Sequence, residues 1–197
     1  AQRLGYDFDS DFFSMLTEGW ADHTKEVWLP INQLGDREGL KFNDGNISMP
    51  IEFKSAYDKS KEGGWLSTAC KPEHGGMGVP VFFQAVTWAE IGTSTNMAMS
   101  VLPALTLGVY DVLIEHGESS LVDYFATHLA SGDWSGTMCL TEPHAGTDLG
   151  IISTKAVPQD DGTYRVTGTK IFITYGEHDM TENIVHLVLA KTPDAPE

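Results

Sequence analysis

The chain has 197 residues, of which 41% are hydrophobic, and this is enough to bury one large core or two small ones. It contains 12 Lys and Arg against 28 Asp and Glu, and the resulting formal net charge of -16 argues against binding to nucleic acid or to an anionic membrane surface. The sequence contains no run of about 18 apolar residues, so we expect no membrane-spanning helix.

The cysteines and the first residues predict the compartment. Cys70 and Cys139 lie far apart without CxxC spacing, so free thiols in a reducing compartment are favoured over a single disulfide. The opening residues, "AQRLGYDFDSDFF", lack the basic and apolar stretches of a signal peptide. We therefore expect a cytoplasmic protein. Both ends of the chain suit a piece of a longer protein.

The first two thirds of the chain predict helices, because apolar residues recur there at three- and four-residue spacing. In the first helix, Phe8, Phe12 and Phe13 are predicted to serve core or subunit packing. Pro30 predicts a kink or break, and Gly117 is a predicted helix end. The predicted helices cover residues 8–20, 27–34, 50–57, 81–91, 96–116 and 119–129.

The stretches "NDGNISMP" and "KPEHGGMGVP" are predicted loops, and the pattern changes to strands after Ser135. Asp161-Gly162 predicts a hairpin with a primed turn. The predicted strands cover residues 153–157, 163–168, 170–174 and 183–191. Helices followed by antiparallel strands predict an α+β fold. We expect an N-terminal helical domain over residues 1–135 and an incomplete β-domain over residues 136–197.

Most familiar site motifs are missing from the sequence. It has no GxxxxGK[ST] phosphate loop, no GxSxG elbow and no HExxH pair. The glycines of "EHGGMGVP" do not fit GxGxxG and follow no strand. His178 and Glu182 lie four residues apart, but no second pair of ligands accompanies them. We therefore expect no metal site.

The polar chemistry that remains is concentrated in "TMCLTEPHAGTDLG". Gly146 permits a positive φ and a close backbone approach to a ligand, and successive free N–H groups in such a turn can hold oxygen anions or polar ring edges. Thr141 and Thr147 add hydroxyls. Asp148 can cap the backbone and Glu142 can anchor the loop at its base. On residue types alone, a capped structural loop and a ligand cradle both remain open.

This loop resembles the first signature motif of the acyl-CoA dehydrogenase family, here as Met138-Cys139-Leu140-Thr141-Glu142-Pro143-His144-Ala145-Gly146-Thr147-Asp148. The stretch "GTKIFIT", residues 168–174, resembles the second flavin-contacting motif of that family. Both motifs occur in the family's order after a helical region, so the chain is identified as a member of the family's long-form branch. The resemblance implies the helical and middle β-domains of such a protein, without its C-terminal helical domain.

The resemblance also implies that the two motifs line FAD. Thr147 would reach the flavin phosphates or the substrate, where most members carry Ser. Phe172 replaces a commoner Trp, and Met138 stands where an aromatic is frequent. The implied cofactor-binding residues are Met138, Leu140, Thr141, Gly146, Thr147, Phe172, Ile173 and Thr174.

The implied reaction is the conversion of an acyl-CoA to a trans-2-enoyl-CoA, with electrons passed from FAD to electron-transferring flavoprotein. The family's glutamate base lies in the C-terminal domain, so we expect no catalytic residue in this chain, Glu142 included. A homo-oligomer, dimer or tetramer, is implied because a neighbouring subunit completes the FAD site. Two alternatives stay open: a flavin oxidase or monooxygenase of the same superfamily, and a non-catalytic interaction subunit.

Overall fold

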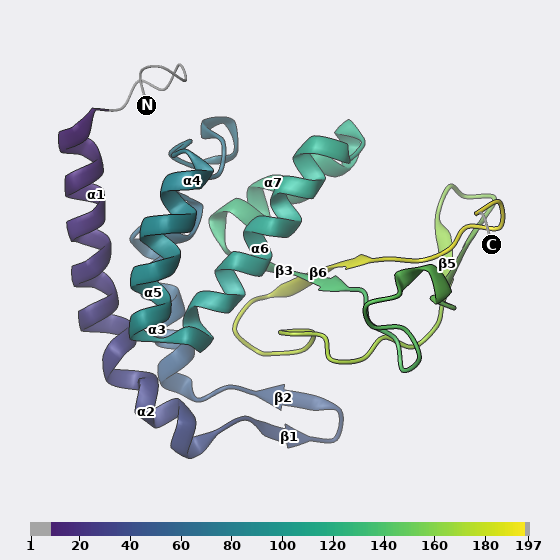
Figure 1. Cartoon of the computed structure of the whole chain (residues 1–197), viewed down its shortest axis with the longest axis horizontal. Helices are drawn as coiled ribbons and strands as arrows, with labels where there is room; N and C mark the ends of the chain where they lie inside the picture. The colour runs from purple at the N-terminus through teal and green to yellow at the C-terminus, as the bar shows by residue number, and fades with distance from the viewer. Residues whose placement is uncertain (1–8, 196–197) are drawn as a thin grey trace.

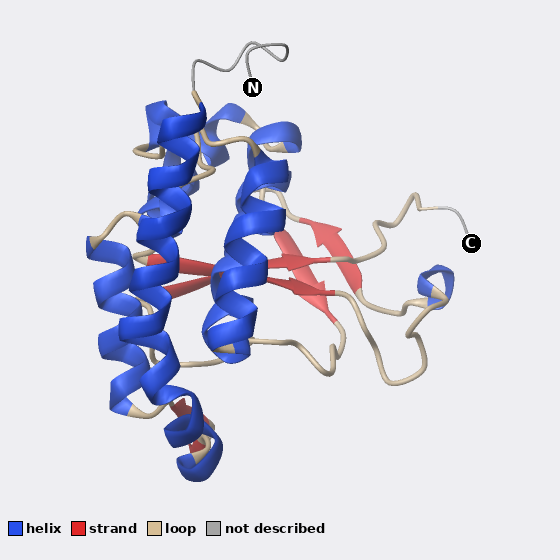
Figure 2. Ribbon diagram, turned by 60° about the vertical axis from the view of Figure 1, so that its left-hand side comes forward, coloured by secondary structure: helices blue, strands red, loops and turns tan. Residues whose placement is uncertain are grey.

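The computed structural model describes residues 9–195 and shows a group of helices followed by small strand pairs (Figures 1 and 2). Phe8 lies outside the described residues. The helices are α1 (Ser10–His23), α2 (Leu29–Glu38), α3 (Ile51–Glu62), α4 (Val81–Phe83), α5 (Ala89–Thr95), α6 (Met97–His116) and α7 (Ser119–Ser131). The strands are β1 (Lys41–Asn43), β2 (Asn46–Ser48), β3 (Trp134–Cys139), β4 (Lys155–Pro158), β5 (Tyr164–Thr167) and β6 (Asn183–Val188).

The predicted break at Pro30 does not occur. A π-helical turn, Thr24–Trp28, joins α1 to α2, and Pro30 lies within the first two positions of α2. Proline is tolerated in the first turn of a helix, because an N–H at that position needs no helical partner. The helical path therefore continues from residue 10 to residue 38.

The predicted loop "NDGNISMP" is wrong over residues 43–48, which belong to an antiparallel hairpin. β1 pairs with β2 in the register Phe42↔Ile47 and Asn43↔Asn46. Asp44 and Gly45 connect the strands with φ of 48° and 87°. Positive φ at both central residues is the mark of a type I′ turn, for which Asp-Gly is a favoured pair. The hairpin extends beside α2 (Figure 1).

Two clusters of buried side chains form the core of the helical region. Trp20 stacks on Trp88 with ring centroids 4.7 Å apart, and Trp28 meets Trp20 edge-on at 4.8 Å. The second cluster centres on Val109 and Tyr110 of α6. Within the described residues, α6 is the one helix long and apolar enough to cross a membrane, with a mean hydropathy of 1.7. It lies against α5, α7 and β3, as the central helix of a core does.

β3 couples the helical region to the strands. The N–H of Gly136 donates to Thr106 Oγ1 of α6 at 3.1 Å, and a Cβ built on Gly136 would lie 2.6 Å from Val109 Cβ. Only a residue without a side chain allows this close approach of strand to helix. The predicted domain boundary between residues 135 and 136 falls inside β3, and the division into two domains stays a prediction.

The α+β class is confirmed, but the strand pairing is mixed. β4 and β5 pair antiparallel as predicted, whereas β3 and β6 pair parallel, from Trp134↔Asn183 to Cys139↔Val188. Sequence patterns do not distinguish the two arrangements in short strands. The turn at Asp161-Gly162 is not a two-residue primed turn: Gln159 N donates to Thr163 O at 2.8 Å across a three-residue loop, and Gly162 alone there has a positive φ, 82°.

Candidate functional site

The fold brings the two sequence motifs side by side. Ile171 N donates to Thr141 O at 2.9 Å, and the Lys170 ammonium donates to Leu140 O at 2.9 Å. Thr137, the residue before the first motif, adds a third bond: its Oγ1 donates to Thr174 O at 2.7 Å. Residues about 30 positions apart in sequence are therefore held together by three hydrogen bonds at the end of β3.

The predicted strand over residues 170–174 is wrong. The stretch bonds to the loop after β3 instead of to a neighbouring strand, and it has no regular secondary structure. Phe172 has φ of 57°, in the left-handed region that an aromatic residue rarely adopts. Two apolar β-branched residues in "KIFIT" favour a strand by propensity, and this tertiary pairing overrides that preference.

Glu142 is the anchor of the site. Its side chain is fully buried, and Oε2 accepts hydrogen bonds from Ser153 N at 2.7 Å and Ser153 Oγ at 2.8 Å. The other oxygen, Oε1, accepts from Thr154 N at 3.0 Å and from the Lys170 ammonium at 2.9 Å. The carboxylate thus ties the turn after β3 to the start of β4 and to the second motif, which confirms its predicted anchoring role.

The environment of Glu142 keeps it ionised. Burial disfavours the charge, but hydrogen bonds from Thr154, Ser153 and Lys170 outweigh burial and hold the pKa of the carboxyl well below its usual range. His144 lies beside it on the surface; its Nε2 is 3.1 Å from Ile151 O, to which an N–H there donates. Because its hydrogen bonds hold Glu142 ionised, this carboxylate is unsuited to proton transfer.

The turn between the anchor and Asp148 leaves donors free for a ligand. Glu142 and Ala145 exchange backbone bonds of 2.9 Å and 3.1 Å, and Asp148 Oδ1 accepts from Gly150 N at 3.1 Å, which confirms the predicted cap. Within the described chain, the N–H groups of Gly146 and Thr147 make no such bond. Gly146 does not use the positive φ that glycine permits, and a Cβ there would meet nothing within 4 Å.

Most of the predicted ligand-contacting residues are exposed or half-buried. Phe172 is 88% exposed and Met138 is 36% exposed, so two large apolar side chains face solvent. The hydroxyls of Thr141, Thr147 and Thr174 have no hydrogen-bond partner among residues 9–195. Leu140 and Ile173 are half-buried below them. Apolar surface beside unpaired donors suits a flat aromatic ligand with polar edges.

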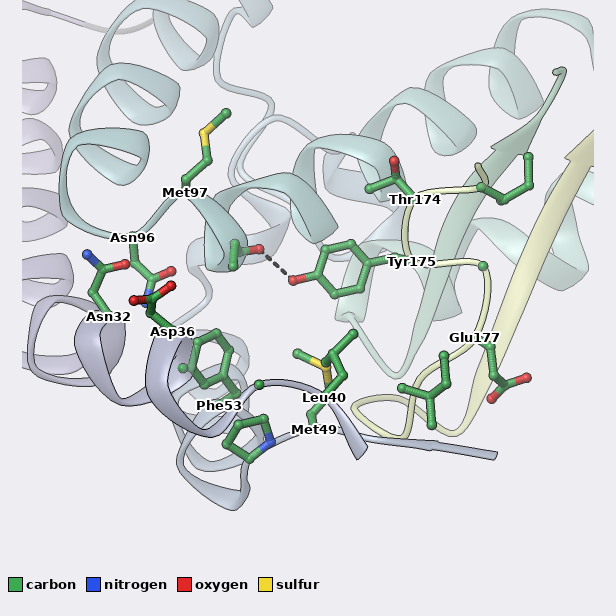
Figure 3. Close-up of a pocket in the computed structure, with 17 residues that line it drawn as sticks. Asn32, Asp36, Leu40, Met49, Phe53, Asn96, Met97, Thr174, Tyr175 and Glu177 are labelled. Atoms are coloured by element: carbon green, nitrogen blue, oxygen red, sulfur yellow. Dashed lines mark hydrogen bonds between the residues drawn. The ribbon is translucent and has the colours of Figure 1, made fainter. Parts of the chain in front are cut away.

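The loop of the second motif also forms one wall of a cavity of about 660 Å³ (Figure 3). Thr174 and Tyr175 lie on one side, and Phe53, Leu40 and Met49 lie on the other. Tyr175 Oη donates to Ala98 O at 2.7 Å, which joins the loop to the first turn of α6. The cavity and the exposed ligand surface therefore share residues.

Two of the residues that hold the site together were missed in the sequence. Lys170 is part of the second motif, but its reach back to Glu142 follows from the tertiary fold. Thr137 precedes the first motif, and only the structure shows its bond to the Thr174 carbonyl. A lysine two residues after a glycine in the second motif is the one signal that could have suggested the first of these contacts. Residues 9–195 contain no cluster of three or more His, Cys, Asp and Glu arranged to hold a metal ion.

The chain is similar to known proteins in sequence and in fold. The family model described as "Acyl-CoA dehydrogenase, middle domain" matches residues 137–196. A 3-methylmercaptopropionyl-CoA dehydrogenase from Ruegeria pomeroyi is 49% identical over 87% of this chain, and a butyryl-CoA dehydrogenase from Syntrophomonas wolfei is 38% identical over 87% of it. An acyl-CoA dehydrogenase from Bacillus anthracis, solved in complex with FAD, shares the fold with a TM-score of 0.75 at 22% identity over 94% of this chain.

The chain covers less than a third of the length of each of these relatives. The chain spans 29% of the length of the Ruegeria protein, 28% of the Syntrophomonas protein and 30% of the Bacillus anthracis chain. It matches one part of each relative.

Proposed function

We propose that this chain, which belongs to the acyl-CoA dehydrogenase family, forms the N-terminal part of an FAD-dependent enzyme that introduces an α,β double bond into an acyl-CoA thioester. The observation that carries the proposal is that hydrogen bonds join the two motifs, each of which has an exposed apolar side chain, Met138 in the first and Phe172 in the second. The reaction would yield a trans-2-enoyl-CoA.

The donor set fits a flavin. An isoalloxazine ring has two apolar faces and a polar edge, and the site offers the exposed Phe172 ring and Met138 thioether for a face. The hydroxyls of Thr141 and Thr174 and the free N–H groups near Gly146 can serve the edge. Thr147 is exposed at the outer end of the turn, where it can reach phosphate oxygens or the pantetheine of the substrate.

The work divides between the cofactor and the chain. When bound, FAD supplies the acceptor for the hydride that leaves the β-carbon. The residues of this chain bind and orient: Lys170 and Glu142 lock the two loops together, and the threonine hydroxyls fix the polar edge of the ring. The α-proton needs a base, and Glu142 is unsuited because it is buried and fully bonded. We place that base in a part of the protein outside this chain.

The partners and the compartment follow from the same proposal. We propose that electrons leave through electron-transferring flavoprotein, and that a homo-oligomer, dimer or tetramer, completes the flavin site from a neighbouring subunit. The free cysteines are both buried, and a cytoplasmic location fits such thiols. The named relatives act on 3-methylmercaptopropionyl-CoA and butyryl-CoA, so the substrate class proposed here is an acyl-CoA thioester.

The proposal is tested by anaerobic titration of the purified full-length protein with acyl-CoA thioesters, followed by its absorbance. Bleaching of a bound flavin is expected, together with slow reoxidation by O2. Fast reoxidation after bleaching would support a flavin oxidase or monooxygenase instead. Absence of flavin, with no uptake of added FAD, would support a non-catalytic subunit.

A paired variant tests the binding surface itself. Phe172→Ala should weaken FAD binding about tenfold, because the ring would lose its aromatic neighbour. Phe42→Ala is the matched control, since Phe42 is 72% exposed on the β1–β2 hairpin and is not part of the proposed site. The test compares FAD dissociation constants of the two variants, measured by fluorescence titration of the apoproteins. Equal effects of the two changes would show that Phe172 does not contact the flavin.

A further inference from the structure

We infer that Tyr175 is a positioning residue for the flavin: its hydroxyl bond to the first turn of α6 sets the direction in which Thr174 faces the ring. The inference rests on the proposed function, because Thr174 is one of the residues proposed to bond the polar edge of the flavin. Its new content is a residue outside both motifs that acts on the cofactor through its neighbour.

The backbone at Tyr175 adopts a conformation that its residue type disfavours. Gly176 N donates to Ile173 O at 3.1 Å, so residues 173–176 form a β-turn with Thr174 and Tyr175 at its centre. Tyr175 has φ of 52°, at the turn position where a positive φ favours Gly or Asn. A tyrosine persists in such a conformation where the contacts around it hold it there. The contacts of the Tyr175 side chain therefore matter to the turn.

The side chain of Tyr175 makes these contacts with the helical region. Its hydroxyl donates to Ala98 O at 2.7 Å, as Figure 3 shows, and its ring packs against the core cluster that contains Trp20 and Trp28. Burial raises the pKa of Tyr175 to about 12, so the hydroxyl is protonated and can donate at neutral pH. The phenol thus connects the turn to α6.

The α6 end of this connection is itself fixed. Asn96 is buried, and its Oδ1 accepts from Met99 N at 3.1 Å and caps the helix. Asn96 Nδ2 donates to Trp28 O at 3.2 Å. Ala98 lies between the cap and Met99, so the helix turn that presents its carbonyl is tied to the core.

A second bond holds the same turn from the opposite neighbour, β3. Thr137 Oγ1 donates to Thr174 O at 2.7 Å. That carbonyl belongs to the peptide group between Thr174 and Tyr175, so the turn is held by a strand at this peptide and by a helix through the next side chain. The Thr174 side chain is exposed. Its direction is therefore set by the backbone that Thr137 and Tyr175 hold.

Loss of the Tyr175 bond should affect the reduced flavin more than the oxidised flavin. Reduction adds electron density to the polar edge of the ring, so a well-directed hydroxyl donor stabilises the reduced form more strongly. Without the bond to Ala98, the Thr174 hydroxyl would take more directions and donate less well. We expect a lower reduction potential and weaker FAD binding.

The test uses the full-length flavin-containing protein with Tyr175→Phe, which removes the hydroxyl and keeps the ring. The midpoint potential of its flavin, measured by anaerobic titration with a reference dye, should fall by about 30 mV. For a two-electron couple this is a loss of about tenfold in the preference for reduced flavin. The FAD dissociation constant of the apoprotein should rise about threefold. An unchanged potential would overturn the inference.

Tyr57→Phe is the matched control, because Tyr57 Oη also donates to a backbone carbonyl, that of Gly132 at 3.0 Å, and Tyr57 is not part of the proposed site. Both variants should lower the unfolding temperature, but the potential should shift in Tyr175→Phe alone. Equal shifts in the two variants would overturn the inference, because a general loosening of the fold would then explain the change.

Tyr175→Asn separates the bond from the turn. Asn adopts a positive φ readily, so this variant keeps the turn and loses the connection to α6. Its potential should fall as far as that of Tyr175→Phe. A potential equal to that of the unchanged protein would show that the turn alone directs Thr174, which would overturn the inference. Absence of bound flavin in the unchanged protein, with no uptake of added FAD, would overturn the proposed function instead.

Discussion

Glu142 shows how one side chain organises the site. It is a buried charge whose hydrogen bonds come from the Ser153 backbone and hydroxyl, the Thr154 backbone and the Lys170 ammonium. Removal of one partner of a buried ion pair leaves the other charge uncompensated. The loop geometry therefore depends on Glu142 remaining ionised.

Glu142→Gln should lower the thermal stability by several degrees at pH 7, because Lys170 would lose its charged partner. The folded-state pKa of Glu142 lies below the ordinary 4.5, so the unfolded chain binds more protons between the two values. The stabilisation is thus fully present above about pH 4.5 and is lost as the pH falls through the folded pKa. Unfolding temperatures from pH 7 to pH 3 should show the gap between the two proteins closing at the acidic end.

Glu115→Gln, at an exposed position on α6, is the control for this series and should show no such closure. A gap for Glu142→Gln that stays constant down to pH 3 would contradict the assigned role of the carboxylate.

At the scale of single residues, the sequence allowed part of the site to be predicted. The cap at Asp148 was predictable because its chemistry is local to the turn. Glu142 was also predicted to anchor the loop, but its partners lie 11 to 28 residues away and follow from the tertiary fold. The left-handed conformation of Phe172 was not foreseen. Its conformation depends on the bond between Ile171 and Thr141, which joins distant parts of the chain.

Among the elements, β3 and α6 pack closely at Gly136. Gly136→Ala should cost about 1–3 kcal/mol in the free energy of unfolding, because the new methyl group would overlap Val109. Gly108→Ala is the neighbouring control; a Cβ there meets nothing within 4 Å, so this change in a helix interior should stabilise by about 0.5–1 kcal/mol. Denaturant unfolding gives both values.

A double variant identifies the cause. Val109→Ala should cost less stability in the Gly136→Ala protein than it does alone, since it removes Cγ1 and Cγ2, two of the three Val109 atoms that the new methyl group meets. Additive losses in the double variant would show that the contact is not the reason for the cost.

Helices were predictable where the spacing of apolar residues stayed helical over many residues. The helices over residues 96–116 and 119–129 were found near their observed bounds, because their caps and apolar spacing agree. The short strands were harder. The β1–β2 hairpin carried its signal in Asp44-Gly45, but its strands have only three residues each and lack a buried face. The strand predicted over residues 170–174 was wrong for the opposite reason: its composition is strand-like, but no neighbouring strand pairs with it.

Across the whole molecule, the strand pairs differ in how well they are supported. β3 has residues buried against α6, whereas β4 and β5 are exposed along most of their length. An isolated two-stranded hairpin is marginally stable in water. Hydrogen exchange of this chain, followed by mass spectrometry, should therefore show amides of β4 and β5 exchanging at least about tenfold faster than those of α6. Equal protection would mean that the hairpin has support from contacts absent in this structure.

The parallel pairing of β3 with β6 has a consequence for assembly. The first motif begins in the last two residues of β3, and the rest of both motifs lies between the two strands, in residues 140–182, so the site is a closed loop whose base is the β3–β6 ladder. Closing so long a segment is slow compared with forming a local hairpin. During synthesis, the ribosome must release residues 183–188 before the loop can close. Until then a finished first motif would have no second motif fixed beside it, and a cofactor arriving early would find only half of its binding surface.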